Sequence, residues 1–404
     1  MLFALLLAAH ITDVATAADD KHPLEVDLDA EYSFVRTTTT ISREGVGDVL
    51  THQRDWSGVN LRLAVGIWHD LEVHAYAPLA IRDLQVWHGL AGASSLSGNT
   101  VSVSGCAGSL CGPVQPIMPV DGSSLRGGFS EPTFGIAWAP ISWERERAPY
   151  AYATWVIGID YTAPIGNRID DPSRWGFNAA GAAGTGSEIR KEHVIRPYMA
   201  FSKRFRVLEP YFKVAGAIPF AAKGAYDNCA HPASLSEVAA VNCIGPWAGQ
   251  TGYQPPYEGT ATLGAELVAY EGSDTRVSFD VRGDMTWHGP QRGYTQVTDA
   301  LGKLTYADEY VTSQGSIGFY GRAARWLHFR VYGLLGVDSA HFLTHEAIGE
   351  DKDSQPGINI SEGAGVPAPD QNPNYDFRLD QPGRRLRAEP AVFWGVAGTL
   401  SLNF

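Results

Sequence analysis

From residue 24 onward, apolar and polar residues alternate with a period of two along much of the chain. The segment "LEVDLDAEYSF" shows the pattern, with four carboxylates on the face opposite its apolar residues Leu24, Val26, Leu28, Ala30, Tyr32 and Phe34. Successive side chains of a β-strand point to opposite faces of a sheet. The alternation therefore predicts a strand with one apolar face and one polar face.

The same alternation recurs in later segments, which brings the expected number of strands to about twelve. A tilted strand needs about nine to eleven residues to cross a bilayer, and most of the segments are close to that length. The further segments are 58–67, 71–77, 134–138, 150–161, 193–202, 208–218, 259–270, 276–287, 310–320, 327–339 and 387–404.

Short and long connections alternate between these segments. Short turns fall at His69-Asp70, "WERERAP", "KRFR", "EGSD" and "GRAAR". The expected long loops are 38–53, 83–128, 164–190, 220–256, 288–308 and 346–386. A soluble β-sandwich would not sort its loop lengths so regularly, whereas the two ends of a membrane barrel face different compartments. We predict an all-β fold: a closed antiparallel up-and-down transmembrane β-barrel of about twelve strands, formed as a single domain by residues 18–404.

The last strand carries a family resemblance. Its apolar residues share one parity and end on an aromatic residue: Val392, Trp394, Val396, Leu400, Leu402 and Phe404. In this feature, and in the strand pattern along nearly its whole mature length, the chain resembles the bacterial outer-membrane β-barrel (porin-like) superfamily, with no specific subfamily indicated. The resemblance implies that the barrel-assembly machinery reads a signal formed by Trp394, Leu400, Leu402 and Phe404. It also implies a place in the cell outer membrane, among lipid and lipopolysaccharide, with the long loops outside.

The N-terminus predicts export. An apolar run from Leu2 to Ala9 precedes Ala15-Thr16-Ala17, which is typical of a signal peptide cleaved after Ala17. We therefore expect residues 1–17 to be removed during export through the periplasm. The run lacks a preceding Lys or Arg, and the alternative is a buried N-terminal helix.

Four cysteines lie in two close pairs, Cys106/Cys111 and Cys229/Cys243. An even number in an exported chain predicts two local disulfides. A zinc site would need more Cys or His ligands than either neighbourhood offers, so we expect no metal and no cofactor. The net charge of −13 disfavours nucleic acid as a partner.

If the apolar parity faces lipid, the opposite parity faces the lumen. A charge at the lipid midplane costs about 2–4 kcal/mol for Arg or Lys, which makes this segregation hard to obtain by chance. The residues predicted to line the pore are Glu25, Asp27, Asp29, Glu31, Arg62, Glu72, His74, Arg196, Lys213, Glu266, Asp280, Arg282, Asp284, Arg330, Arg387 and Glu389.

Two interpretations of the lumen remain open. Small inward residues such as Gly158, Ala200 and Gly264 would leave a narrow water-filled path, or opposite charges would pair across the interior and plug it. Carboxylates outnumber bases in the predicted lining, which favours cations or neutral solutes in an open pore. We predict a channel for passive or weakly selective transport of small solutes. The alternative is a closed barrel that acts as an adhesion or structural surface protein through its long loops.

Catalysis is not expected. Outer-membrane hydrolases need an ordered set of catalytic side chains. Asp83, His88, Asp284, His288 and His341 could approach the outer rim, but they form no motif. The sequence therefore predicts that the protein is not an enzyme.

Overall fold

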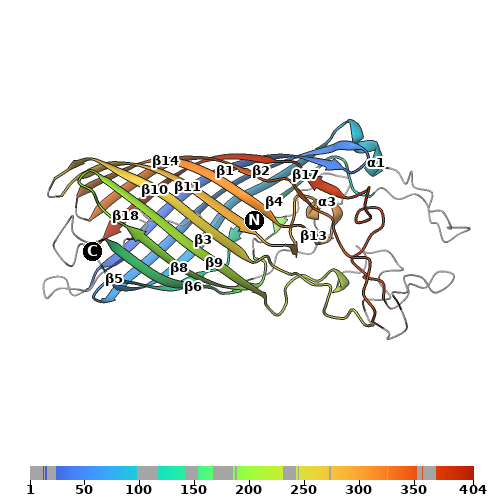
Figure 1. The fold of residues 1–404 in the computed structure, drawn as a ribbon, viewed down its shortest axis with the longest axis horizontal. Coiled ribbons are helices and arrows are strands. Elements are labelled where there is room, and N and C mark those ends of the chain that lie inside the picture. The colour runs from blue at the N-terminus through green and yellow to red at the C-terminus, as the bar shows by residue number, and fades with distance from the viewer. Residues whose placement is uncertain are drawn as a thin grey trace, which may run out of the picture.

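The chain forms a closed antiparallel barrel of twelve strands (Figure 1). The computed structural model describes residues 12, 14–15, 24–97, 117–141, 153–166, 185–186, 189–230, 243, 245–272, 274–324, 326–352, 357 and 370–404. Among these residues, no helix is both long enough and apolar enough to cross a membrane. The predicted fold class and strand number are confirmed.

Each barrel strand overlaps one of the predicted segments. The strands are β1 (Val26–Arg43), β2 (Gly47–Trp68), β3 (Leu71–Gly89), β5 (Thr133–Ile141), β6 (Thr154–Thr162), β8 (Glu192–Ser202), β9 (Leu208–Ala221), β10 (Glu258–Glu271), β11 (Arg276–His288), β14 (Tyr310–Ala324), β15 (Leu327–Asp338) and β18 (Ala391–Asn403).

Short elements gather at the end of the barrel that carries the long loops. Four strands extend the main sheet: β4 (Gly122–Phe129), β7 (Thr185–Gly186), β16 (His341–Phe342) and β17 (Leu386–Ala388). A separate pair is formed by β12 (Gln291–Gly293) and β13 (Thr305–Ala307). The short helices are η1 (Ala91–Ala93), α1 (Ser94–Ser97), η3 (Asn228–Ala230) and α3 (Thr298–Leu301). The C-terminus lies at the opposite end (Figure 1).

The last strand closes the barrel against the first. In the register of β18 with β1, Leu402 pairs with Leu28 and Val396 pairs with Phe34. The backbone of Phe404 exchanges two hydrogen bonds with Val26, at 3.1 and 3.0 Å. Because the barrel is closed, no edge of the described strands exposes unpaired backbone N–H and C=O groups, which lipid could not satisfy.

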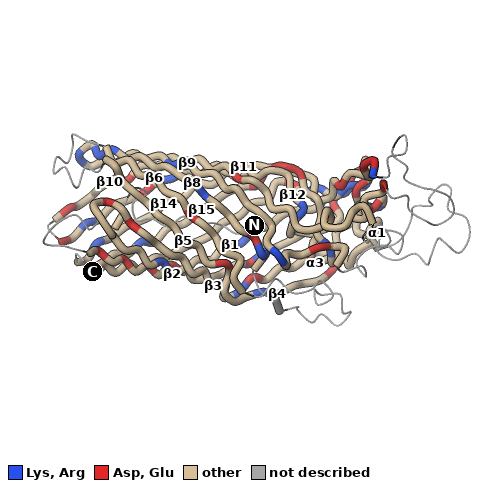
Figure 2. Tube along the Cα trace, turned by 90° about the horizontal axis from the view of Figure 1, so that it is seen from below, with Lys and Arg blue, Asp and Glu red and all other residues tan. Residues whose placement is uncertain are grey.

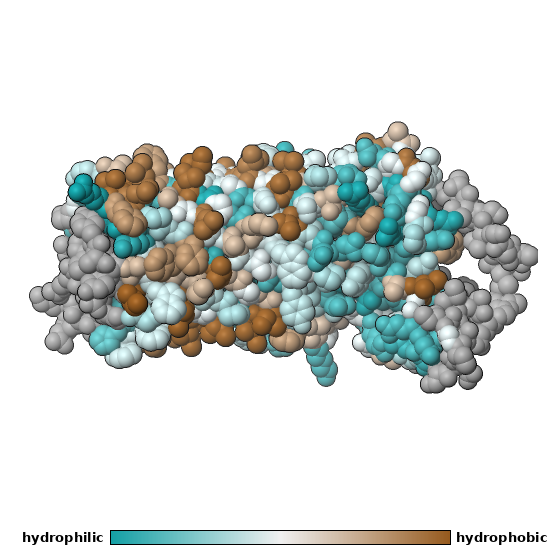
Figure 3. Space-filling view, in the orientation of Figure 1, coloured by the Kyte–Doolittle hydropathy of each residue, from teal (hydrophilic) through white to brown (hydrophobic). Residues whose placement is uncertain are grey.

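The outer face of the strands is apolar. Large exposed side chains such as Leu263, Ile317, Leu335 and Trp394 follow the outward parity. Figure 3 shows hydrophobic side chains over the strand portion of the molecule and more hydrophilic ones toward the loop end. This apolar belt is a surface suited to lipid.

Two of the predicted loops, 38–53 and 83–128, are shorter in the structure than the sequence suggested, because the adjoining strands extend into them. Strand β1 runs to Arg43 and β2 begins at Gly47, so most of residues 38–53 form a hairpin rather than a loop. The threonine run Thr37–Thr40 favours extended backbone, and Thr40 pairs with Thr51. Strand β3 likewise continues to Gly89, beyond the expected boundary at residue 83. The bilayer thickness limits the membrane crossing but not the strand.

The main hydrophobic core lies in the mouth of the barrel, at the end that carries the long loops. Helix α3 and the ends of several strands pack together there, with Leu50, Trp87, Leu301, Leu343 and Leu386 fully or almost fully buried. The segment 288–308 therefore folds over the opening instead of extending into solvent.

Arg387 and Glu389 do not face the lumen, and their prediction as pore-lining residues is wrong. Leu386 and Ala388 are fully buried, whereas Arg387 between them is exposed. Glu389 accepts a 2.6 Å hydrogen bond from Ser42, which lies between the buried residues Ile41 and Arg43. The register explains the error: Ile41 pairs with Ala388, but Thr38 pairs with Val392. One extra residue near Pro390 forms a bulge, which reverses the side-chain parity.

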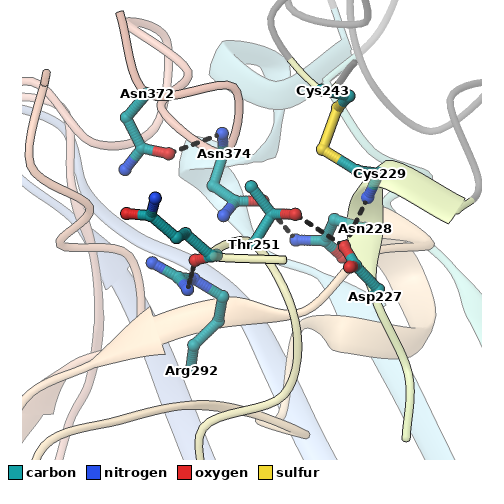
Figure 4. The surroundings of a disulfide bond; sticks show 9 residues. Asp227, Asn228, Cys229, Cys243, Thr251, Arg292, Asn372 and Asn374 are labelled. Atoms are coloured by element: carbon teal, nitrogen blue, oxygen red, sulfur yellow. Dashed lines mark hydrogen bonds between the residues drawn. A yellow bond between two sulfur atoms is a disulfide. The ribbon is translucent and has the colours of Figure 1, made fainter. Parts of the chain in front are cut away.

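The predicted disulfide between Cys229 and Cys243 is present (Figure 4). Cys106 and Cys111 lie outside the described residues. Beside the disulfide, the Asn228 side chain donates to Asn374 Oδ1 at 2.8 Å and to the Leu304 carbonyl at 3.1 Å. Asn228 thus ties three loops together at the mouth.

Candidate lumen and its upper cavity

Most of the predicted pore-lining residues occupy inward positions of the barrel strands, and Glu25 directly precedes β1 with the same parity. Figure 2 shows acidic and basic positions interspersed along the barrel. The residues on inward strand positions are Asp27, Asp29, Glu31, Arg62, Glu72, His74, Arg196, Lys213, Glu266, Asp280, Arg282, Asp284 and Arg330.

Arg62 forms the centre of a first charge network. Its guanidinium donates to Asp29 at 3.1 Å and to Glu72 at 2.7 Å. The imidazole of His74 lies 2.8 Å from the same Glu72 and 2.9 Å from Asp160. The network connects β1, β2, β3 and β6 along one side of the lumen.

Arg276 forms the centre of a second network. Its guanidinium donates to Glu266 at 2.9 Å and lies 3.7 Å from Glu209. Ser278 also donates to Glu266, and Ser202 donates to Glu209 at 3.1 Å. These residues cover the inner wall from β8 to β11.

A third network lies between β9 and β15. Arg330 and Tyr211 each donate to Asp280 at 2.6 Å. Beside them, the guanidinium of Arg282 donates to Asp284 at 2.8 Å. The carboxylates here are again held by neighbouring donors.

These ion pairs follow the wall of the barrel. Arg62 pairs with residues of its two adjacent strands, and Arg276 pairs with β10 next to it. The His74–Asp160 and Arg330–Asp280 pairs each skip a single strand. Each pair therefore bridges a short arc of the circumference, which satisfies the charges without crossing the lumen.

Two inward glycines provide seats for tyrosine rings. A Cβ added to Gly158 would lie 2.3 Å from Tyr198 Cζ, and one added to Gly264 would lie 2.4 Å from Tyr211 Cζ. Both rings therefore lie flat against the neighbouring strand. Our interpretation that Gly158 and Gly264 leave empty space is wrong at these positions, because the rings fill it. The two tyrosine rings lie along the barrel wall and do not point across the lumen.

One stretch of the wall consists mainly of small side chains. Ala137, Ala139, Val156 and Ala200 form a buried cluster on β5, β6 and β8, and Val14 and Tyr198 pack against it. Two further contacts place the N-terminal segment here: Thr12 Oγ1 lies 2.9 Å from Ser202 Oγ, and Ala15 N donates to Glu72 at 2.7 Å. This part of the lumen therefore holds Thr12, Val14 and Ala15.

A cavity of about 160 Å³ lies on the loop side of these networks. Its lining includes the pairs Arg54–Asp83, at 2.6 Å, and Arg126–Asp299. Asp299 belongs to α3, so this ion pair anchors the inward-folded segment to β4. Arg196 also lines the cavity.

Aromatic rings form part of the same cavity wall. Tyr310 stacks between His288 and His341, with ring centroids 4.5 and 4.2 Å away. His288 also contacts Glu258 at 3.0 Å. The cavity thus combines planar rings with charged groups of both signs.

No protein-family model matches the chain, and no curated protein is similar to it in sequence. Among solved structures, an outer membrane channel from Pseudomonas putida F1 is 12% identical, with 94% of this chain and 95% of that chain covered and a TM-score of 0.44. A FadL homologue from Pseudomonas aeruginosa is 9% identical, covers 94% and 90%, and has a TM-score of 0.36. The outer membrane protease OmpT from Escherichia coli is 8% identical, covers 94% and 96%, and has a TM-score of 0.29.

The assignment rests on the geometry: a closed barrel with an apolar outside and a charged, internally paired inside. The chain is a closed β-barrel whose apolar outer face suits a lipid environment. Its lumen contains groups that the sequence did not single out, among them Arg54, Arg126 and Asp299. Arg54 shares the inward parity of Arg62. The sequence would have identified it if the predicted strand had begun before residue 58. The pairing of Asp299 depends on how a loop folds, which no periodicity reports.

The rim residues are only partly brought together. Asp83, His288 and His341 line the same cavity, whereas Asp284 lies deeper in the third network. His88 is exposed, with 69% of its side chain accessible, next to Asp121.

Proposed function

We propose that this barrel is a passive channel for small polar solutes. The observation that carries the proposal is the direction of the lumen ion pairs, which run along the wall. Opposite charges that paired across the interior would have closed the barrel, as in the second interpretation of the sequence. Pairs along the wall stabilise the charges and favour a water-filled centre.

The proposed path begins in the cavity beneath α3, passes Arg196 and follows the wall of small residues on β5, β6 and β8. Twelve strands lie between the small barrels filled by side chains and the wide aqueous porins. The folded-over mouth narrows the entrance further. We therefore expect a strict upper limit on solute size.

Thr12, Val14 and Ala15 occupy the small-residue wall and so lie in this path. Cleavage after Ala17, as the sequence predicts, would remove these residues and leave the space to water. The transporting form is therefore the chain that begins at residue 18.

Liposome swelling with neutral solutes of graded size tests the proposal. Vesicles that contain the chain from residue 18 should swell with the smallest sugars and amino acids, and larger oligosaccharides should give no swelling. Replacing Ala200 by Trp places a bulky ring on the inner wall and should slow swelling strongly. The matched control is Ala261→Trp, because Ala261 is exposed on the outer face of β10.

A second variant separates blockage of the path from a folding defect, because its side chain is enlarged only after the protein has folded. Ala200→Cys adds a small side chain, and a charged thiol reagent is applied after reconstitution. The reagent should reduce swelling in this variant and leave the parent protein unchanged. Swelling that is insensitive to both Ala200 changes would contradict the proposed path along this wall. No swelling with any solute would contradict the channel and favour a closed surface protein.

A further inference from the structure

The lumen cations are not all engaged in the same way. Arg62, Arg276, Arg282 and Arg330 each contact a carboxylate. Arg196 and Lys213, on the adjacent strands β8 and β9, make no ion pair with a carboxylate among the residues that the structure describes. They differ in this from the four arginines, which lie on the same inner wall.

The pairing of Asp160 explains why Arg196 is left over. Asp160 lies directly opposite Arg196 in the register of β6 with β8, where an ion pair would be expected. Instead its carboxylate accepts from His74 Nε2 at 2.9 Å. Arg196 therefore lines the cavity, and its guanidinium makes no ion pair with a carboxylate of the described residues.

Lys213 lies further along the same wall. Its backbone pairs with Ala200, and its ammonium lies 4.2 Å from the ring centroid of Tyr198, the inward residue next to Arg196. Four residues of a strand span roughly 13 Å, so the two positive groups lie within a short distance along the path. The small-residue cluster begins at Ala200 beside them.

We propose that Arg196 and Lys213 form successive binding sites for small anions, with carboxylates as the preferred class, along the lumen. This proposal rests on the proposed channel function. The planar guanidinium of Arg196 matches the geometry of a carboxylate, and the compact ammonium of Lys213 receives the anion next. Two weak sites in series let an ion enter and leave, which conduction requires. The excess of carboxylates in the sequence does not oppose this, because neighbouring donors hold most of those carboxylates, among them Asp29, Glu72 and Asp280.

Reversal potentials in planar bilayers test the inference with the chain from residue 18. Under a potassium chloride gradient, the parent channel should be anion-selective. The Arg196→Gln/Lys213→Gln double variant should lose that preference, and Arg196→Lys should keep most of it. The control is Arg385→Gln, which removes one positive charge from the rim pair with Glu44 and should leave selectivity unchanged.

Potassium acetate on one side against chloride on the other tests the class of anion. Acetate should carry current comparable to that of chloride in the parent channel. A conducting but cation-selective channel, a double variant with unchanged selectivity, or an impermeant acetate would overturn this inference alone. An absence of conductance under all conditions would overturn the proposed function and this inference with it.

Discussion

Gly135 occupies the point where the His74–Asp160 hydrogen bond passes over β5. A Cβ at this position would lie 2.2 Å from His74 Nε2 and 2.3 Å from Asp160 Oδ1. Neither approach is possible, so a side chain here must displace one partner. The glycine is required by the network rather than by its backbone conformation.

Replacing Gly135 by Ala should therefore break the bond and destabilise the barrel by about 1–3 kcal/mol, because a buried polar group loses its partner. The measurement is urea unfolding of the refolded protein in lipid vesicles. Gly259→Ala on β10 is the control, since a Cβ there meets no atom within 4 Å. Equal stability of both variants would argue against the network.

Asp380 gives the mouth a pH dependence. Burial raises the pKa of this carboxyl from 3.8 to about 6, although it accepts backbone hydrogen bonds from Glu346 and Asp376. The folded state therefore holds the proton more tightly than the unfolded state. The contribution of Asp380 to loop stability is full below about pH 4 and declines as the pH rises through 6.

Hydrogen exchange of residues 370–386 should accordingly be slower at pH 4 than at pH 7, after correction for the intrinsic pH dependence of exchange. In Asp380→Asn the difference attributable to this group should vanish. Protection that increases with pH through this window in the parent, or an unchanged profile in the variant, would refute the assignment.

At the residue scale, the sequence predicts the inward parity well but not the partners. Alternation places Arg62, Glu72 and Asp280 correctly on the inner wall because the pleat forces it. It fails at Arg387, since a single bulge residue reverses the parity. The choice of His74 over Arg196 by Asp160 depends on distances that a linear pattern does not contain.

At the scale of elements, the terminal strand combines two roles. It seals the barrel against β1, and we propose that it also carries the signal read by the assembly machinery. Phe404 is 71% exposed and pairs with Val26 through its backbone alone. Its side chain thus contributes little to packing.

Phe404→Ala should therefore reduce insertion into the outer membrane in cells, while the refolded protein keeps nearly the stability of the parent. Phe129→Ala is the matched control, because Phe129 is also an exposed phenylalanine, at 63%. The readouts are the heat-modifiable band in cell envelopes and unfolding in vitro. Normal insertion of Phe404→Ala would count against a signal role for this residue.

The strands themselves follow from periodicity, whereas the loop structures do not. Every predicted segment overlaps a strand, but β2 has 22 residues, about twice what a crossing requires. The inward fold of α3 depends on contacts such as Arg126–Asp299, between residues far apart in the sequence. Such long-range contacts leave no local pattern.

At the scale of the whole molecule, the N-terminal segment and the lumen exclude each other. Thr12 and Ala15 bond to the inner wall, so the uncleaved chain places a peptide in the proposed path. A chain from residue 18 should admit solutes faster than a chain refolded with residues 1–17. Mass spectrometry of the exported protein should find Ala18 at its N-terminus.

The most direct test of the central claim, that the charged lumen is open, is single-channel conductance of the chain from residue 18 in planar bilayers. We predict small, discrete steps whose size falls when the Ala200→Cys variant is modified from within the lumen. No steps at any salt concentration or voltage, from protein verified as folded, would contradict the account.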